Sequence, residues 1–133
     1  MFDRLRQLTR TANPTGAGAQ GSRVATLTEA DFGAGLTGGW TVVDFWAPWC
    51  GPCRQFAPRF EALAGSEQGR VRFARCDIEQ HPGPAAALGI VSIPTVALFD
   101  PDGRLRDRLV GVPSARRFEA FLAQVPRQTE PAE

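Results

Sequence analysis

The chain has 133 residues, 43% of them hydrophobic, which suits one compact domain with a single core. Its 15 basic and 14 acidic residues leave a net charge of +1, so composition gives no broad field for nucleic acid or anionic lipid. Three cysteines cannot all pair within one chain, which argues against a disulfide framework and favours a reducing compartment with a redox or metal role for the thiols.

Residues 1–22 differ from the rest of the chain, and we expect them to form a flexible N-terminal extension. Residues 13–22 are turn and linker types. Before them, Phe2, Leu5 and Leu8 recur near helical spacing among arginines, so an amphipathic helix that docks on a partner or a membrane surface competes with a frayed basic tail. An organelle-targeting peptide is disfavoured because the stretch has almost no Ser.

No apolar run reaches the length of a membrane span or a secretory signal, so we expect a cytoplasmic protein.

From Arg23 onward, strand and helix patterns alternate. The first helix is predicted from the capping-box pair Thr28 and Asp31 and ends near Gly38. A helix that starts at Cys50 contains Pro58, which should kink it. The predicted strands are 24–27, 40–47, 71–76, 95–99 and 105–110, and the other predicted helices start at Pro84, ending before Gly89, and at Ser114.

The order βαβαβαββα predicts an α/β fold with a central mixed β-sheet of about five strands, flanked by about four helices on both faces. The domain is expected to span residues 23–126, followed by a flexible C-terminal tail at 127–133. We expect a monomer.

The chemistry is expected at Cys50 and Cys53, where an apolar strand gives way to a helix. Unpaired backbone N–H groups at a helix start stabilise a thiolate, which favours Cys50 as nucleophile. Cys53, one turn further on, faces the same side and can resolve a mixed disulfide. Gly51 lets a substrate backbone approach, and Pro52 is tolerated in a first helical turn. A zinc site that adds Cys76 and His81 is the alternative, but its spacing does not match common zinc patterns.

Two further residues stand out in the pattern. Asp44 lies inside an apolar strand, where burial raises a carboxyl pKa and suits a group that takes a proton from Cys53; a structural acid paired with an arginine is the alternative. Pro94 opens a strand, and an edge proline is the simpler interpretation from the residues alone.

Residues 43–53, followed by Pro58 and by Ile93, Pro94 and Thr95, resemble the thioredoxin family, and the likeness covers roughly residues 23–125. The Trp-Cys-Gly-Pro-Cys segment is specific to that family. The resemblance implies a thioredoxin fold, and it implies a protein disulfide reductase that exchanges a Cys50/Cys53 dithiol with substrate disulfides. No cofactor would be bound, because electrons would come from NADPH through thioredoxin reductase. The partners would be that reductase and disulfide-containing proteins.

Carried over by position, the resemblance implies roles for individual residues. Cys50 would be the attacking thiolate, Cys53 the resolving thiol, Asp44 the buried proton acceptor, and Pro94 a cis proline against the disulfide. The substrate surface would consist of Trp49, Gly51, Pro52, Ile93, Pro94, Gly111 and Val112, with the Ile93 backbone pairing with an extended substrate.

The chain departs from the family pattern in a few places. Arg75 stands where a Lys is usual near Asp44 and should hold that carboxyl ionised. Pro48 stands where an acidic residue is frequent, and Cys76 is extra. We expect Cys76 to be a small buried hydrophobe and His81 to be a surface residue.

Other functions remain open at this point. A non-redox binding module that uses the same apolar surface and an exported, tethered thiol reductase are both compatible with the pattern.

Overall fold

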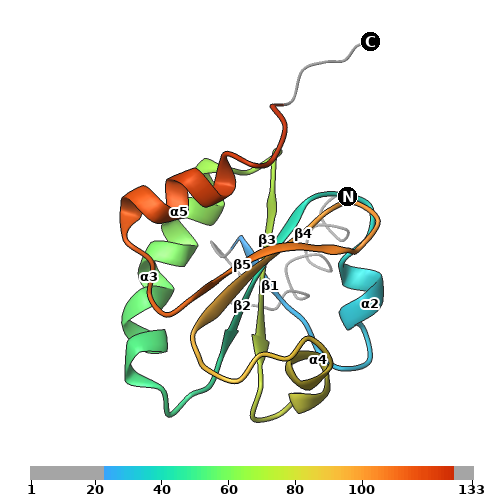
Figure 1. Ribbon diagram of the computed structural model, residues 1–133, viewed down its shortest axis with the longest axis vertical. Helices are drawn as coiled ribbons and strands as arrows, with labels where there is room; N and C mark the ends of the chain where they lie inside the picture. Colours follow the sequence, from blue (N-terminus) through green and yellow to red (C-terminus); the bar gives the residue numbers. More distant parts are fainter. Residues whose placement is uncertain (1–22, 128–133) are drawn as a thin grey trace, which may run out of the picture.

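A computed structural model describes residues 23–127, and its centre is one five-stranded sheet in the order β1-β3-β2-β4-β5 (Figure 1). Strands β1, β3 and β2 run parallel, whereas β4 runs antiparallel to both β2 and β5. The predicted mixed sheet is therefore confirmed. The strands are β1 Val24–Thr26, β2 Thr41–Trp46, β3 Arg72–Asp77, β4 Thr95–Phe99 and β5 Leu105–Val110.

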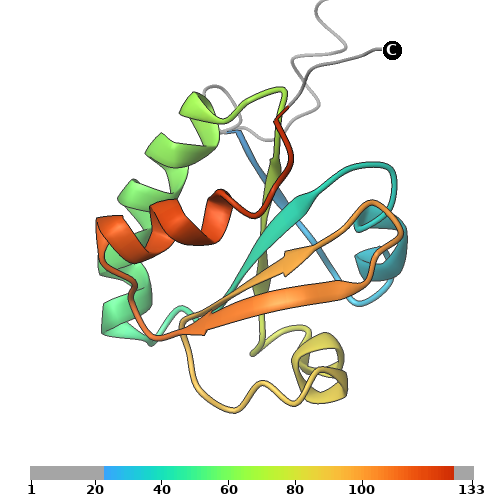
Figure 2. The same ribbon diagram turned by 45° about the horizontal axis from the view of Figure 1, so that its top comes forward.

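Four helices of the described part of the chain cover the sheet on its two faces: α2 (Phe32–Gly35), α3 (Gly51–Ser66), α4 (Pro82–Ala87) and α5 (Ala115–Leu122). Figures 1 and 2 show α3 and α5 together on one face and α2 and α4 on the other. Both faces are covered because the inner strands are apolar throughout: β4 is buried at every position, and β2 is buried from Thr41 to Phe45.

Alternation along the strands divides the core between the two faces. Val42 packs with α3 and α5 in a cluster that contains Phe56, Phe60 and Phe118, while its neighbour Val43 packs in the opposite cluster with α4. Asp44 has the same parity as Val42, so its side chain lies on the α3 and α5 face of the sheet.

Two helix predictions are wrong in extent. Thr28 and Asp31 do bond to each other, with Thr28 N–H donating to Asp31 Oδ1 at 2.7 Å and Asp31 N–H donating to Thr28 Oγ1 at 3.3 Å, but these bonds close a turn before α2, whose N-cap, Asp31, makes no side-chain capping bond. Only the four residues of α2 follow as helix, because this stretch contains two glycines, which lose more backbone entropy in a helix than other residues do. Helix α4 starts at Pro82 and not at Pro84, since both prolines fit a first helical turn.

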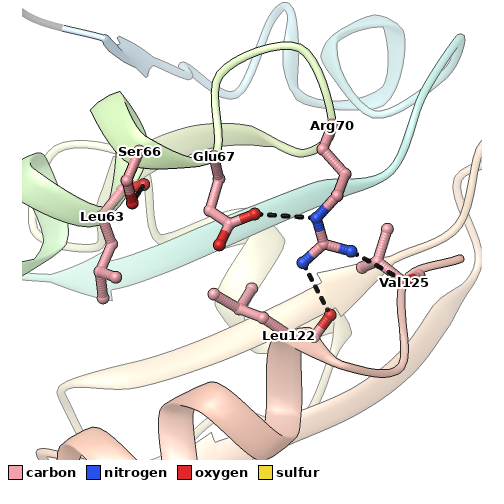
Figure 3. A network of polar contacts seen from close by, with 6 residues as sticks. All are labelled: Leu63, Ser66, Glu67, Arg70, Leu122 and Val125. Carbon is pink, nitrogen blue, oxygen red and sulfur yellow. Dashed lines mark hydrogen bonds and ion pairs between the residues drawn. The ribbon is translucent and has the colours of Figure 1, made fainter. Parts of the chain in front are cut away.

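Arg70 connects the end of α3 to the end of α5 (Figure 3). Its guanidinium donates to Glu67 Oε1 at 2.8 Å, to the carbonyl of Val125 at 2.9 Å and to the carbonyl of Leu122 at 3.1 Å. The last carbonyls of a helix have no partner within that helix, and Arg70 gives charged donors to the carbonyls of Leu122, the last residue of α5, and of Val125 just beyond it.

The predictions for residues 1–22 and for the end of the tail, residues 128–133, lie outside the described residues. Among residues 23–127, no helix is long and apolar enough to cross a membrane.

Candidate active site

Cys50 and Cys53 form a disulfide at the start of α3, with their Cα atoms 5.3 Å apart. Cys50 is the N-cap residue in an extended conformation, and its Sγ accepts a hydrogen bond from the Cys53 backbone N–H at 3.2 Å. Gly51 and Pro52 complete the first turn, where a missing proline N–H costs no helical bond. The helix then runs unbroken through Pro58 to Ser66.

The two sulfurs differ in access. Cys50 is 5% exposed and Cys53 is fully buried, so an incoming disulfide can reach only the first of the pair. The N–H groups of the first turn and the positive end of the α3 dipole lie at the Cys50 sulfur, and both stabilise a thiolate there once the bond is reduced.

The loop before β4 reaches the same sulfur. The Ile93–Pro94 peptide bond is cis, and the Ile93 carbonyl oxygen lies 4.0 Å from Cys50 Sγ. The Gly111 N–H donates to the Pro94 carbonyl at 2.8 Å, which joins the end of β5 to this loop. The structure therefore brings together three segments that are far apart in the chain.

Exposed apolar side chains lie on these segments. Trp49 is 65% exposed and Val112 is 44% exposed, and Gly51 and Pro52 are also exposed. The indole N–H of Trp49 donates to Glu79 Oε1, which fixes the ring. The contact with Glu79 was not predicted, because nothing in the local sequence indicates that a residue 30 positions away lies beside the indole.

Asp44 is fully buried in the middle of β2, directly opposite Arg75 on β3. Its Oδ2 lies 3.8 Å from Arg75 Nε, and neither carboxyl oxygen has a hydrogen-bond partner among the described residues. Burial raises the pKa of Asp44 to about 7, although the Arg75 charge acts in the opposite direction. The Arg75 charge favours the ionised carboxyl, as expected, but desolvation has the larger effect on the pKa, and Arg75 makes no hydrogen bond to the carboxyl.

Arg75 has a second contact that explains its position. Its guanidinium carbon lies 4.1 Å from the centroid of the Trp46 ring, and the side chain is 23% exposed. A guanidinium stays charged, so Arg75 makes a cation–π contact with Trp46 while its Nε remains 3.8 Å from Asp44 Oδ2.

Cys76 and His81 are not part of this site. Cys76 is fully buried in the α4-side core, and burial raises the pKa of its thiol to about 11, with Asp77, Glu29 and Asp31 adding to the shift. His81 caps the start of α4 and is half-buried, so it is less exposed than expected; its Nδ1 accepts from the Glu29 N–H at 3.3 Å. Within residues 23–127, no group of three or more His, Cys, Asp or Glu side chains is arranged to hold a metal ion.

The comparisons with known proteins identify the family. The thioredoxin family model matches residues 23–124. The chain belongs to the thioredoxin family. The predicted thioredoxin fold is thereby confirmed, and with Cys50 and Cys53 in place the protein is a thiol–disulfide oxidoreductase.

Individual thioredoxins agree with this assignment. A thioredoxin from Staphylococcus epidermidis is 40% identical over 88 residues, which cover 66% of this chain and 84% of the relative. A thioredoxin from Staphylococcus aureus matches with the same identity and coverage. The crystal structure of Fasciola hepatica thioredoxin superposes with a TM-score of 0.71 at 34% identity, covering 77% of this chain and 100% of the other.

Proposed function

We propose that the protein reduces disulfides in other proteins through a mixed disulfide at Cys50. The single observation that carries this proposal is the position of Cys50. Cys50 is 5% exposed at a helix start, beside exposed apolar residues, whereas Cys53 is fully buried.

The reduced protein starts the reaction as a dithiol. The Cys50 thiolate attacks one sulfur of the substrate disulfide, that S–S bond breaks, and the other substrate sulfur leaves as a thiolate that takes up a proton. Trp49, Gly51, Pro52, Ile93, Pro94, Gly111 and Val112 form the surface that receives the substrate chain, with the Ile93 backbone available for pairing.

Cys53 then resolves the mixed disulfide. Its thiol gives a proton to Asp44, and the resulting thiolate attacks Cys50 Sγ. The Cys50–Cys53 disulfide forms and the second substrate sulfur leaves, so two electrons have passed from the dithiol to the substrate. A carboxyl with a pKa of about 7 is suited to this step because it can accept and release the proton near neutral pH.

We also propose that thioredoxin reductase returns the pair to the dithiol with electrons from NADPH, in the cytoplasm. The chain itself needs no bound cofactor for this exchange, since both electrons are carried by sulfur. The low cysteine content supports a reducing compartment, and fractionation of cells tests it. Residues 23–126 are proposed as the whole folded domain, acting as a monomer without nucleic-acid or membrane partners; the family match over 23–124 supports the boundary.

Substitution of each cysteine tests the mechanism. Cys50→Ser is expected to abolish insulin reduction, because no nucleophile remains at the surface. Cys53→Ser is expected to accumulate a mixed disulfide with insulin, seen as an adduct by mass spectrometry under non-reducing conditions. The assay is NADPH-coupled reduction with a thioredoxin reductase, and dithiothreitol as reductant separates failure of the reductase from failure of the exchange.

Cys76→Ala is the matched control. It removes the remaining cysteine, which lies outside the site, and should reduce insulin at the wild-type rate. Full turnover by Cys50→Ser would contradict the proposal.

A further inference from the structure

The loop between β5 and α5 is held by a hydrogen bond at each end. Gly111 N–H donates to the Pro94 carbonyl at 2.8 Å, and Arg59 Nη2 donates to the Pro113 carbonyl at 2.7 Å. Val112 lies between these two bonds and is 44% exposed. Figure 1 shows this loop passing beside α3, the helix that carries Arg59 and starts at the cysteine pair.

The Arg59 side chain is also held by a contact within its own helix. Its guanidinium carbon lies 5.3 Å from the ring centroid of Phe56, which is one turn earlier on α3 and buried in the core. The Arg59 side chain is half-buried, and a charged donor makes a stronger hydrogen bond than a neutral one. The Pro113 carbonyl is thus connected through Arg59 to the helix that carries the disulfide.

We propose that Arg59 is a positioning residue for protein substrates, which holds the 111–113 loop so that Val112 stays beside the cysteine pair. The inference rests on the proposed function, because it takes Gly111 and Val112 as part of the substrate surface. A protein that carries the substrate disulfide would contact both Cys50 and the 111–113 loop. A small disulfide needs only the sulfur, so it should not depend on Arg59.

The test compares two disulfides in stoichiometric reactions of the reduced protein, quenched by alkylation and read by mass spectrometry. Arg59→Met keeps the apolar stem and removes the donor. It is expected to lower the second-order rate constant for insulin about fivefold, the usual scale for one lost hydrogen bond. The rate constant for cystamine should stay within about twofold, because the sulfur chemistry is intact. Arg59→Lys keeps a charged donor and should recover part of the rate with insulin.

A direct measurement follows the loop itself. Amide hydrogen exchange at Gly111 reports its bond to Pro94, and we expect faster exchange in Arg59→Met than in the wild type. Arg116→Met removes an exposed arginine from α5, the helix after the loop, and should change neither the rates nor the exchange.

Unchanged Gly111 exchange in Arg59→Met would overturn the inference, and so would a parallel loss with insulin and cystamine, which indicates general destabilisation. A wild-type protein that does not reduce insulin would instead count against the proposed function, and Gly111 exchange would still decide the role of Arg59.

Discussion

Asp44 is a carboxyl held in an environment that disfavours its charge. The nearest cation, Arg75, is engaged with the Trp46 ring and makes no hydrogen bond to the carboxyl. The pKa of Asp44 is about 7 in the folded state, compared with 3.8 for an unperturbed Asp. Between these two pH values the folded protein therefore keeps a proton that the unfolded chain has already lost. The contribution of Asp44 to folding stability therefore falls as pH rises from about 4 to about 7.

Asp44→Asn should remove this pH dependence. The amide has the shape of the protonated carboxyl and never ionises, so the variant is expected to match the wild type near pH 4. At pH 8 it should be more stable by about 4 kcal/mol, the cost of ionising a group whose pKa is raised by about 3 units. Urea unfolding of the oxidised protein across this range measures the difference.

Asp102→Asn provides the control, since Asp102 is exposed on the turn between β4 and β5 and should shift stability by less than about 0.5 kcal/mol at either pH. If Asp44→Asn showed equal gains at pH 4 and pH 8, the raised pKa could not be the cause.

At this scale the sequence predicted what lies in local motifs. The cysteine pair was found from its place at a helix start, and Asp44 from its place in an apolar strand. The cis Ile93–Pro94 bond agrees with what the family resemblance implied. The contacts of Trp49 with Glu79 and of Arg59 with Pro113 span 30 and 54 residues. Such contacts depend on how turns place long side chains, and no spacing rule predicts them.

Helices α3 and α5 are joined at their C-terminal ends by Arg70 (Figure 3). The guanidinium donates to two carbonyls at the end of the α5 region, so each of these bonds has a charged donor. The bond to Glu67 is a partly exposed pair within one turn, and pairs of that kind contribute little.

Arg70→Met should therefore cost more stability than Glu67→Gln. We expect a loss of about 2 kcal/mol for Arg70→Met, since two carbonyls lose their charged donor, and a loss below about 1 kcal/mol for Glu67→Gln. Chemical unfolding measures both, and amide exchange in α5 should quicken only in Arg70→Met. Equal losses of stability in the two variants would show that the ion pair with Glu67, and not the carbonyl contacts, stabilises the junction of α3 and α5.

The accuracy of the element predictions also has physical causes. Strands β4 and β5 were predicted at their observed bounds, because residues 100–103 form a turn that fixes both ends: Gly103 has a φ of +86° and donates to the Asp100 carbonyl at 2.8 Å. Helix α2 was predicted too long because the Thr28 and Asp31 bonds close a turn before the helix, and the helix then includes two glycines.

In the described residues, the two larger of the three hydrophobic clusters share one sheet. Alternate residues of β2 and β4 point into opposite clusters, so loss of packing on one face disturbs the strands that support the other. The aromatic side chains of the α3 and α5 face are in mutual contact, with Phe118 between Phe56 and Phe121, each at a centroid distance of 5.9 Å.

Phe118→Ala should destabilise the protein by about 3–5 kcal/mol through the cavity that it leaves. Because the sheet is shared, near-UV and far-UV circular dichroism are expected to report the same unfolding midpoint. Ala120→Ser, at an exposed position of the same helix, should change stability by less than about 0.5 kcal/mol. Separate midpoints for the two signals would show that the faces unfold independently.

Within residues 23–127 the strand order places β1 and β5 at the two borders of the sheet, and border strands are where a foreign strand can pair. Strand β1 has only three residues, and β5 carries Arg106, Asp107 and Arg108 in its middle, with an irregular register against β4 at Leu98 and Phe99. The short length of β1, and the charged side chains and irregular register of β5, all disfavour edge-to-edge strand pairing between two copies of the chain. We therefore expect the choice of outermost strands to disfavour fibril formation.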